Sequence, residues 1–189
     1  DDRRQMGRAL LRAHLLVEAM TSARDGSLWW GAGPALYRRK DGKVLEYYGD
    51  TPWLASDRVW SLCEDRVEGI WVGTYNGKVG LLKQRKFTAQ KGFSGKPVTS
   101  IVQAADGTLW VGTLGGGLAR LQNDRLTMLT VKDGLQSDLI RCLRLDSEGA
   151  LWIGTDGGGL NRWSNGKIAG FTTQHGVMDN NILQILEEK

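Results

Sequence analysis

The sequence is poor in the residues from which most active sites and metal centres are built. It holds two cysteines, Cys63 and Cys142, and two histidines, His14 and His175. The cysteines have no metal-ligand spacing and form no disulfide framework, and neither histidine belongs to a repeated motif. Nucleophile elbows, P-loops and calcium loops are also missing. We therefore expect this segment to be no enzyme and to use neither a metal nor a cofactor.

Proline and long apolar runs are scarce as well. The chain has 3 prolines, and no run approaches the ~18 apolar residues that a membrane helix needs. Glycine, in contrast, occurs 26 times, roughly twice its average usage of about 7%. Glycine with so little proline indicates many tight turns between short strands. The net charge of +4 is mild. We interpret the basic clusters of the chain as solvated residues at the rims of loops, so no nucleic-acid partner is expected.

A motif built around tryptophan occurs four times. The spacings between its first tryptophans are 42, 39 and 42 residues. Four such matches at nearly one period establish an internal repeat, which takes precedence over every other signal in the sequence. The copies are LWWGA at 28–32, IWVGT at 70–74, LWVGT at 109–113 and LWIGT at 151–155.

Each repeat reads as four short strands joined by turns. An apolar first strand leads through a polar turn to the tryptophan strand, and a glycine-containing turn then starts a third strand. A fourth strand follows about ten residues later. Strands this short and this closely spaced exclude a parallel sheet with helical crossovers. A four-stranded antiparallel sheet repeated every ~40 residues predicts an all-β fold, a β-propeller. A β-solenoid or a sandwich explains the spacing less well.

The predicted blades cover 15–53, 54–92, 93–134 and 135–176, with a partial fifth unit at 177–189. Residues 182–187 match the first strand of that fifth unit. Residues 1–14 match nothing in the repeat and read as an N-terminal extension, either a short helix or a frayed end. Four units and a stub are fewer than large propellers have, so we expect a piece of a longer array. A closed ring of four blades is the alternative.

Candidate binding residues come from the segments that differ between repeats. In a propeller, the loop before each first strand and the turn between the second and third strands lie on one face. Aromatic rings beside carboxylates and amides on such a face suit a polar ligand such as a sugar. The alternative is structural, with Trp53 capping the core and the Asp and Asn residues forming turns. The candidates are Trp53, Asp57, Arg58, Trp60, Tyr75, Asn76, Gln136, Asp138, Arg141, Asp156, Asp179 and Asn180.

The stretch GLQSDLIRCLRLDSEGALWIGTDGGGLNRW at 134–163 resembles the two-component regulator propeller repeat. In that repeat, G-L-x-x-x-x-I/V leads to D-x-x-G-x-L-W-I-G-T and then to G-G-G-L. The third and fourth units match closely. The second unit departs from the pattern at 76–79, and the first at 31–34. The likeness extends over about residues 15–189.

The resemblance implies a sensor region on the periplasmic or extracellular side of a membrane-anchored bacterial receptor. Receptors of this family carry a histidine kinase or diguanylate cyclase output, and many are thought to sense carbohydrates. The implied partners are a small-molecule ligand such as an oligosaccharide, the remaining blades and the membrane-linked output domain. A homodimer of the full-length receptor is compatible with it. The motif marks blade structure and transfers no ligand residues.

Two other functions stay open. The stretch DGSLW at 25–29 is similar to blades of virginiamycin-B-lyase-like enzymes, which need a histidine-centred metal site. The second open function is a scaffold propeller that binds other proteins. Such a scaffold would show a large apolar patch on one face. A sensor for a small ligand would instead show converging polar groups.

Overall fold

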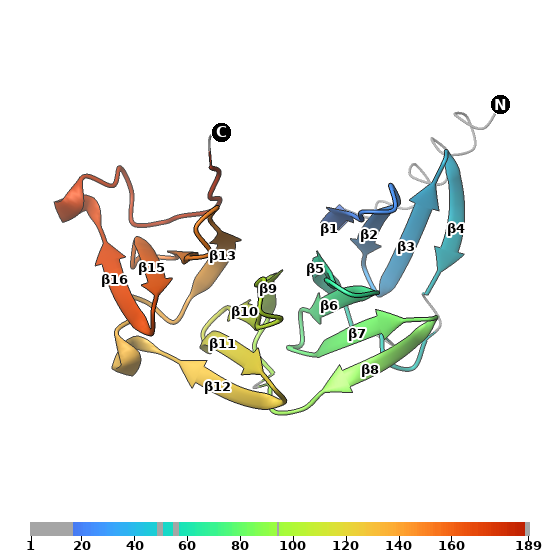
Figure 1. The fold of residues 1–189 in the computed structure, drawn as a ribbon, viewed down its shortest axis with the longest axis horizontal. Coiled ribbons are helices and arrows are strands. Elements are labelled where there is room, and N and C mark those ends of the chain that lie inside the picture. Colours follow the sequence, from blue (N-terminus) through green and yellow to red (C-terminus); the bar gives the residue numbers. More distant parts are fainter. Residues whose placement is uncertain (1–16, 49–50, 55–56, 94, 188–189) are drawn as a thin grey trace.

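The computed structural model describes residues 17–48, 51–54, 57–93 and 95–187 (Figure 1). The predicted N-terminal extension at 1–14 lies outside the described residues. Among those residues, no helix is long and apolar enough to cross a membrane. The described chain forms four antiparallel sheets of four strands, each in the order of the sequence. This arrangement confirms the predicted all-β fold of four-stranded antiparallel blades.

The first two blades have the following strands. Blade 1 contains β1 (Val17–Ser22), β2 (Leu28–Ala32), β3 (Ala35–Lys40) and β4 (Lys43–Tyr47). Blade 2 contains β5 (Val59–Glu64), β6 (Ile70–Thr74), β7 (Val79–Lys83) and β8 (Lys86–Gln90).

The other two blades repeat this order, and a short 3-10 helix follows each of them. Blade 3 contains β9 (Val98–Gln103), β10 (Leu109–Thr113), β11 (Gly117–Gln122) and β12 (Arg125–Leu129), followed by η1 (Val131–Asp133). Blade 4 contains β13 (Ile140–Leu145), β14 (Leu151–Thr155), β15 (Leu160–Ser164) and β16 (Lys167–Phe171), followed by η2 (Thr173–His175).

The blades are arranged side by side in an open arc (Figure 1). The first strand of each blade lies on the inside of the arc and the fourth strand lies on the outside. The inner strands β1, β5, β9 and β13 contact one another in that order. The turns between first and second strands lie at the opposite end of the strands from those between second and third strands, because neighbouring strands are antiparallel.

Apolar side chains fill the space between neighbouring blades. Trp29 of blade 1 packs with Val59 and Ile70 of blade 2 in the first of three buried clusters. Trp71 and Trp110 occupy the same place in the second and third clusters. All three indoles are at most 7% exposed. The tryptophan of the repeat therefore holds each blade to the next one, as its periodicity predicts.

The glycine within each tryptophan motif is required by the neighbouring blade. A Cβ atom at Gly112 would lie 2.6 Å from Cγ2 of Ile140, on the first strand of the next blade. The same contact recurs at every junction, with distances of 2.4 to 2.7 Å to the nearest side-chain carbon of the following unit. The pairs are Gly31 with Val59, Gly73 with Val98, Gly112 with Ile140 and Gly154 with Ile182.

The predicted first strand of a fifth unit has the position of a strand but not its hydrogen-bond pattern. Ile182 contacts Gly154 as its counterparts do, and its amide donates to the carbonyl of Thr155 at 2.9 Å. Residues 181–187 nevertheless carry no regular secondary structure. An inner strand pairs with the second strand of its own blade, and the described residues contain no such strand for this segment.

Candidate functional site

Each inner strand carries a β-bulge at the same position of the repeat. The pairing with the second strand skips one residue, which is Glu18 in β1, Trp60 in β5, Thr99 in β9 and Arg141 in β13. A bulge redirects the side chain of the extra residue. In blades 2 to 4 the bulge residue on the inner strand is a different amino acid each time, namely Trp60, Thr99 or Arg141.

A second variable position lies beside the first in three of the blades. It is the first residue after the second strand, fifteen residues beyond the bulge, and is Tyr75, Leu114 or Asp156. We call these two positions in blades 2 to 4 the inner rim. The inner rim consists of Trp60, Tyr75, Thr99, Leu114, Arg141 and Asp156.

The inner rim holds an aromatic pair in blade 2 and an ion pair in blade 4. The rings of Trp60 and Tyr75 stack with their centroids 4.6 Å apart and their planes 10° from parallel. Arg141 binds Asp156 through both Nε, at 3.1 Å from Oδ2, and a terminal guanidinium nitrogen. Thr99 lies between them on β9 and its hydroxyl donates to the carbonyl of Ile140 at 2.8 Å. Four of the predicted residues thus form two contacting pairs.

These side chains are accessible. Tyr75 is 45% exposed, and the side chains of Arg141 and Asp156 are 36% and 32% exposed. A flat aromatic face, a guanidinium and a carboxylate that accepts hydrogen bonds are the groups with which proteins hold polar ligands. The inner rim can therefore stack against one part of a ligand and hydrogen-bond another.

The predicted residues of the loop before β5 support the rim. Asp57 is 1% exposed, accepts from the amide of Asn76 at 3.1 Å and lies 3.8 Å from the ammonium of Lys78. Trp53 stacks on Phe87 at 4.8 Å and packs against the first buried cluster. The contacts of Asp57 hold the β6–β7 turn that carries Tyr75, whereas Trp53 packs against β8 and the core. The remaining two candidates here, Arg58 and Asn76, are exposed.

The predicted residues near η1 and η2 hold turns together. The carboxylate of Asp138 accepts from the amide of Val131 at 2.9 Å, and the Asn180 side chain accepts from Thr173 at the same distance. Asp179 accepts from the amide of Asn181, and the Gln136 amide donates to the Asn161 side chain. The first three contacts hold turns, whereas the contact of Gln136 joins the segment after η1 to Asn161 on β15.

A recurring cluster at the opposite end of the strands was not among the predictions. Arg38, Arg120 and Arg162 each lie over the tryptophan of their own blade, with 5.3 to 5.6 Å from the guanidinium carbon to the ring centroid. In blade 2 the cross-strand partner of Trp71 is Leu81 instead. The Gly-Leu-x-Arg motif at 117–120 and 159–162 was the signal that could have revealed these cation–π pairs.

An aspartate in the turn before each tryptophan completes the cluster. Hydrogen bonds from the hydroxyl and amide of Ser27 lower the pKa of Asp25, and those from the amide and hydroxyl of Thr108 lower the pKa of Asp106. At Asp146, burial raises the pKa, but hydrogen bonds led by the indole of Trp152 outweigh it and leave a net lowering. These carboxylates are ionised at neutral pH and hold their turns.

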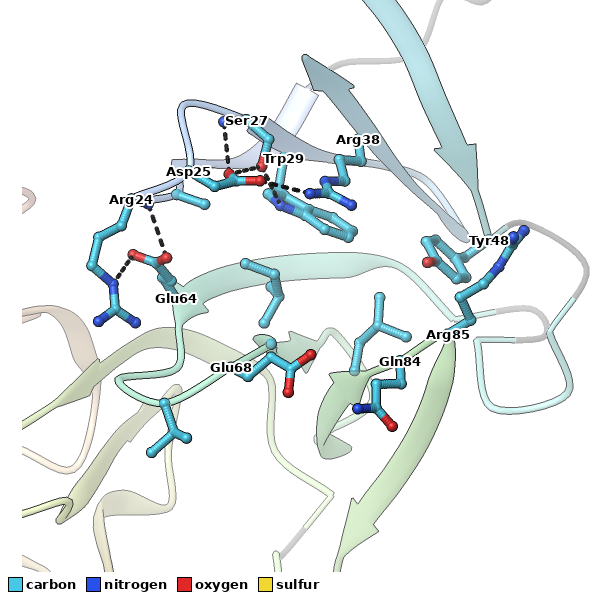
Figure 2. Close-up of a pocket in the computed structure, with 15 residues that line it drawn as sticks. Arg24, Asp25, Ser27, Trp29, Arg38, Tyr48, Glu64, Glu68, Gln84 and Arg85 are labelled. Atoms are coloured by element: carbon cyan, nitrogen blue, oxygen red, sulfur yellow. Dashed lines mark hydrogen bonds and ion pairs between the residues drawn. The ribbon is translucent and has the colours of Figure 1, made fainter.

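Two grooves lie between blades on this same face. One, of about 500 Å³, runs between blades 1 and 2 (Figure 2). The other, of about 470 Å³, occupies the equivalent place between blades 3 and 4. Neither groove is lined by any residue that the sequence singled out for binding. These two grooves thus lie away from the inner rim.

The described residues offer little for metal or thiol chemistry. No group of three or more His, Cys, Asp or Glu side chains among them is placed to hold a metal ion. Burial raises the pKa of both Cys63 and Cys142 to about 11. A thiol with so high a pKa stays protonated at neutral pH and is a poor nucleophile.

The sequence of the chain matches the family model described as two component regulator propeller at three places. The matched residues are 54–76, 92–115 and 134–157. Each match spans an inner strand, the turn after it and the tryptophan strand. The chain carries two component regulator propeller repeats. No curated protein matches the sequence.

The repeats have the fold of several solved propellers. The extracellular domain of BT3049 from B. thetaiotaomicron, described as a hybrid two component system, superposes with a TM-score of 0.71 at 23% identity over 88% of this chain and 24% of that one. Virginiamycin B lyase from Staphylococcus aureus gives 0.68 at 19% identity over 82% of this chain and 55% of that one. The extracellular domain of BT4673 from B. thetaiotaomicron gives 0.62 at 21% identity over 74% and 20%.

The coverage of these proteins is asymmetric. Most of this chain superposes, but it spans only about a quarter of the BT3049 domain and about half of the lyase. Four consecutive blades in an open arc (Figure 1) fit a segment of a larger propeller.

Proposed function

We propose that this chain is the ligand-binding part of a non-catalytic sensor propeller in a bacterial signal-transduction receptor. The observation that carries the proposal is the inner rim, where Trp60 and Tyr75 stack beside Thr99 and the Arg141–Asp156 pair. These side chains differ from blade to blade at the same two positions of the repeat. Variable and accessible side chains at fixed positions of a repeated scaffold are what a recognition surface needs.

The groups on the inner rim suit a carbohydrate or a similar polar molecule. A sugar ring has a C–H face that packs on an aromatic ring and hydroxyls that pair with a guanidinium or a carboxylate. The Trp60–Tyr75 pair provides the first surface, and Arg141 with Asp156 provides the second. Because Arg141 and Asp156 are already paired, they are held in place for the ligand at little further loss of side-chain entropy.

The proposed setting is the extracytoplasmic side of a membrane-anchored receptor. The fold likeness to the extracellular domains of BT3049 and BT4673 supports it, as do the three regulator propeller repeats. In this setting the remaining blades would complete the propeller, and a histidine kinase or another output domain would respond to the ligand. Binding shifts a receptor between states only through a difference in affinity for them.

The likeness to virginiamycin B lyase makes a lyase the second candidate. Such an enzyme needs a histidine at its metal site, and His175, on η2, binds the backbone and side chain of Thr172 instead. A scaffold that binds another protein is a further outcome of the test below.

The test is a thermal-shift screen of the extracytoplasmic region of the parent protein against oligosaccharides, followed by calorimetry of any hit. A ligand present at 100 times its Kd stabilises the native state by about 2.7 kcal/mol. Tyr75→Ala should weaken binding about three- to tenfold, since a stacked pair contributes about 0.5–1.5 kcal/mol.

The matched control is Tyr37→Ala, which breaks the Trp30–Tyr37 stack of blade 1 at 5.2 Å and should leave the affinity unchanged. Equal affinity of the Tyr75→Ala variant would contradict the inner rim as the site. If no sugar changes the melting temperature and substrate turnover appears on adding a divalent metal, the lyase is favoured. If neither a thermal shift nor turnover is seen, the scaffold is favoured.

A further inference from the structure

The groove between blades 1 and 2 has charged groups of both signs on each wall (Figure 2). Trp29 and Arg38 line it from blade 1, and Glu68 and Gln84 line it from blade 2. Glu64 and Arg24 lie at one end, and Tyr48 and Arg85 lie at the other. Ile70 and Leu82 add apolar surface to the lining. The groove therefore combines aromatic and aliphatic carbon with several charged groups.

The groove between blades 3 and 4 provides an internal comparison. It has nearly the same volume and lies at the same place in the repeat. Its tryptophan, arginine and turn aspartate are also present, so those three groups belong to the blade design. Four charged residues of the first groove have uncharged counterparts at the equivalent positions of blades 3 and 4. The exchanges are Arg24 for Ala105, Glu64 for Leu145, Glu68 for Gly149 and Arg85 for Gly166.

The carboxylates of the first groove are all neutralised. Asp25 pairs with Arg38 at 2.7 Å and with Lys40 at 3.5 Å. Glu64 pairs with Arg24 at 3.1 Å, and Glu68 pairs with Lys83 at 3.2 Å. Arg85, in contrast, has no ion pair with any of the described residues. The lining thus has three arginines, Arg24, Arg38 and Arg85, and three carboxylates, and Arg85 is the lining cation that none of these carboxylates pairs with.

The backbone at Arg85 adopts a conformation that its side chain does not favour. Gln84 and Arg85 form the β7–β8 turn with φ of 47° and 65°, in the left-handed region that disfavours residues with a Cβ. The corresponding turns use Asp41-Gly42, Asn123-Asp124 and Asn165-Gly166, which tolerate positive φ. Of the four equivalent turns, only this one keeps a long side chain at both left-handed positions. Backbone strain retained in this way indicates that the side chains have a function.

We propose that this groove is a second binding site, for a small organic anion of the carboxylate class. The guanidinium of Arg85 binds the carboxylate, which matches its paired N–H donors. The amide of Gln84 donates a further hydrogen bond, and the carbon skeleton of the ligand packs against Leu82 and the ring of Tyr48. The site lies at the opposite end of the strands from the inner rim, so it is independent of the ligand proposed there.

The test uses malonate as the probe and malonamide as its uncharged isostere, with ionic strength held constant. Binding is followed by calorimetry and by the shift of the arginine side-chain N–H resonances. We expect malonate but not malonamide to bind the native chain. Arg85→Gly should weaken malonate binding at least tenfold, and it should fold because glycine is the residue that blade 4 uses in this turn. Arg85→Gln, which keeps a polar side chain with N–H donors but removes the positive charge, should do the same.

Two controls separate a site from general attraction of anions. Lys86→Ala removes the neighbouring exposed cation, which does not line the groove, and should leave malonate affinity unchanged. Tyr75→Ala should also bind malonate as the native chain does. Equal affinity in Arg85→Gly, equal loss in Lys86→Ala, or no binding to the folded native chain would each overturn the proposal.

Discussion

Replacing Gly112 by alanine should force blades 3 and 4 apart. The new Cβ would lie 2.6 Å from Cγ2 of Ile140 and 3.2 Å from its Cβ, whereas carbon atoms in ordinary contact are about 3.5–4.0 Å apart. Ile140 is fully buried, so its side chain has no free space to move into. Overpacking of this kind costs about 1–3 kcal/mol of unfolding free energy, measured by urea denaturation.

A double-mutant cycle with Ile140→Ala tests the cause. Ile140→Ala alone should cost about 2–5 kcal/mol, because it opens a cavity in the third buried cluster. In the double variant the new methyl group at 112 enters that cavity. We therefore expect a coupling free energy of about 1 kcal/mol or more in the direction of rescue.

The control for loss of a glycine is Gly107→Ala. A Cβ there meets nothing within 4 Å, but φ is 86°, so alanine costs about 1 kcal/mol through the backbone alone. Ile140→Ala should not relieve that cost. If Gly112→Ala and Ile140→Ala prove additive, steric contact between the blades is not why glycine occupies this position.

Three further outcomes follow from the structure. Arg85→Gly should raise the free energy of unfolding by about 1 kcal/mol, because it removes a side chain from a left-handed turn; an unchanged urea midpoint would contradict this. Leu118→Ala, at a fully buried position, should lower it by about 2–5 kcal/mol, and a loss below about 1 kcal/mol would refute that role. The turn carboxylates have lower pKa values in the folded chain, so their stabilisation is complete above the unfolded pKa of about 3.9 and is lost as pH falls through the folded pKa. Asp146→Asn should accordingly flatten the fall in urea midpoint between pH 5 and pH 2, and an unaltered slope would count against it.

The period of the repeat was sufficient to predict the blades, because the same tryptophan and glycine recur in each unit and serve the same contact. The fifth-unit segment at 182–187 shows the limit of that reasoning. Its sequence matches an inner strand, but strand pairing depends on a partner that the pattern cannot supply. Ile182 is placed as predicted through its contact with Gly154.

The sequence could name candidate residues for a site but could not say how they are arranged. The repeat period alone does not decide whether Trp60 and Arg141 point toward the axis or into a blade interface. The reason is that a bulge shifts the alternation of side chains by one residue. Their partners Tyr75 and Asp156 lie in the turns after the second strands, and the period does not show that they meet the bulge residues. Trp53 shows the opposite case, since an aromatic residue in a loop near the rim packs into the core instead.

The contact between each glycine and the β-branched residue of the following blade gives the array a direction. At every junction the glycine of one blade leaves room for a side chain of the next blade. Each blade is therefore coupled only to its nearest neighbours, and always in the same direction along the chain. A blade is then an interchangeable module. Duplicating residues 98–139 between blades 3 and 4 would recreate both junctions with Val98 and Ile140 in their usual places, and evolution could lengthen such a propeller one blade at a time without redesigning its core.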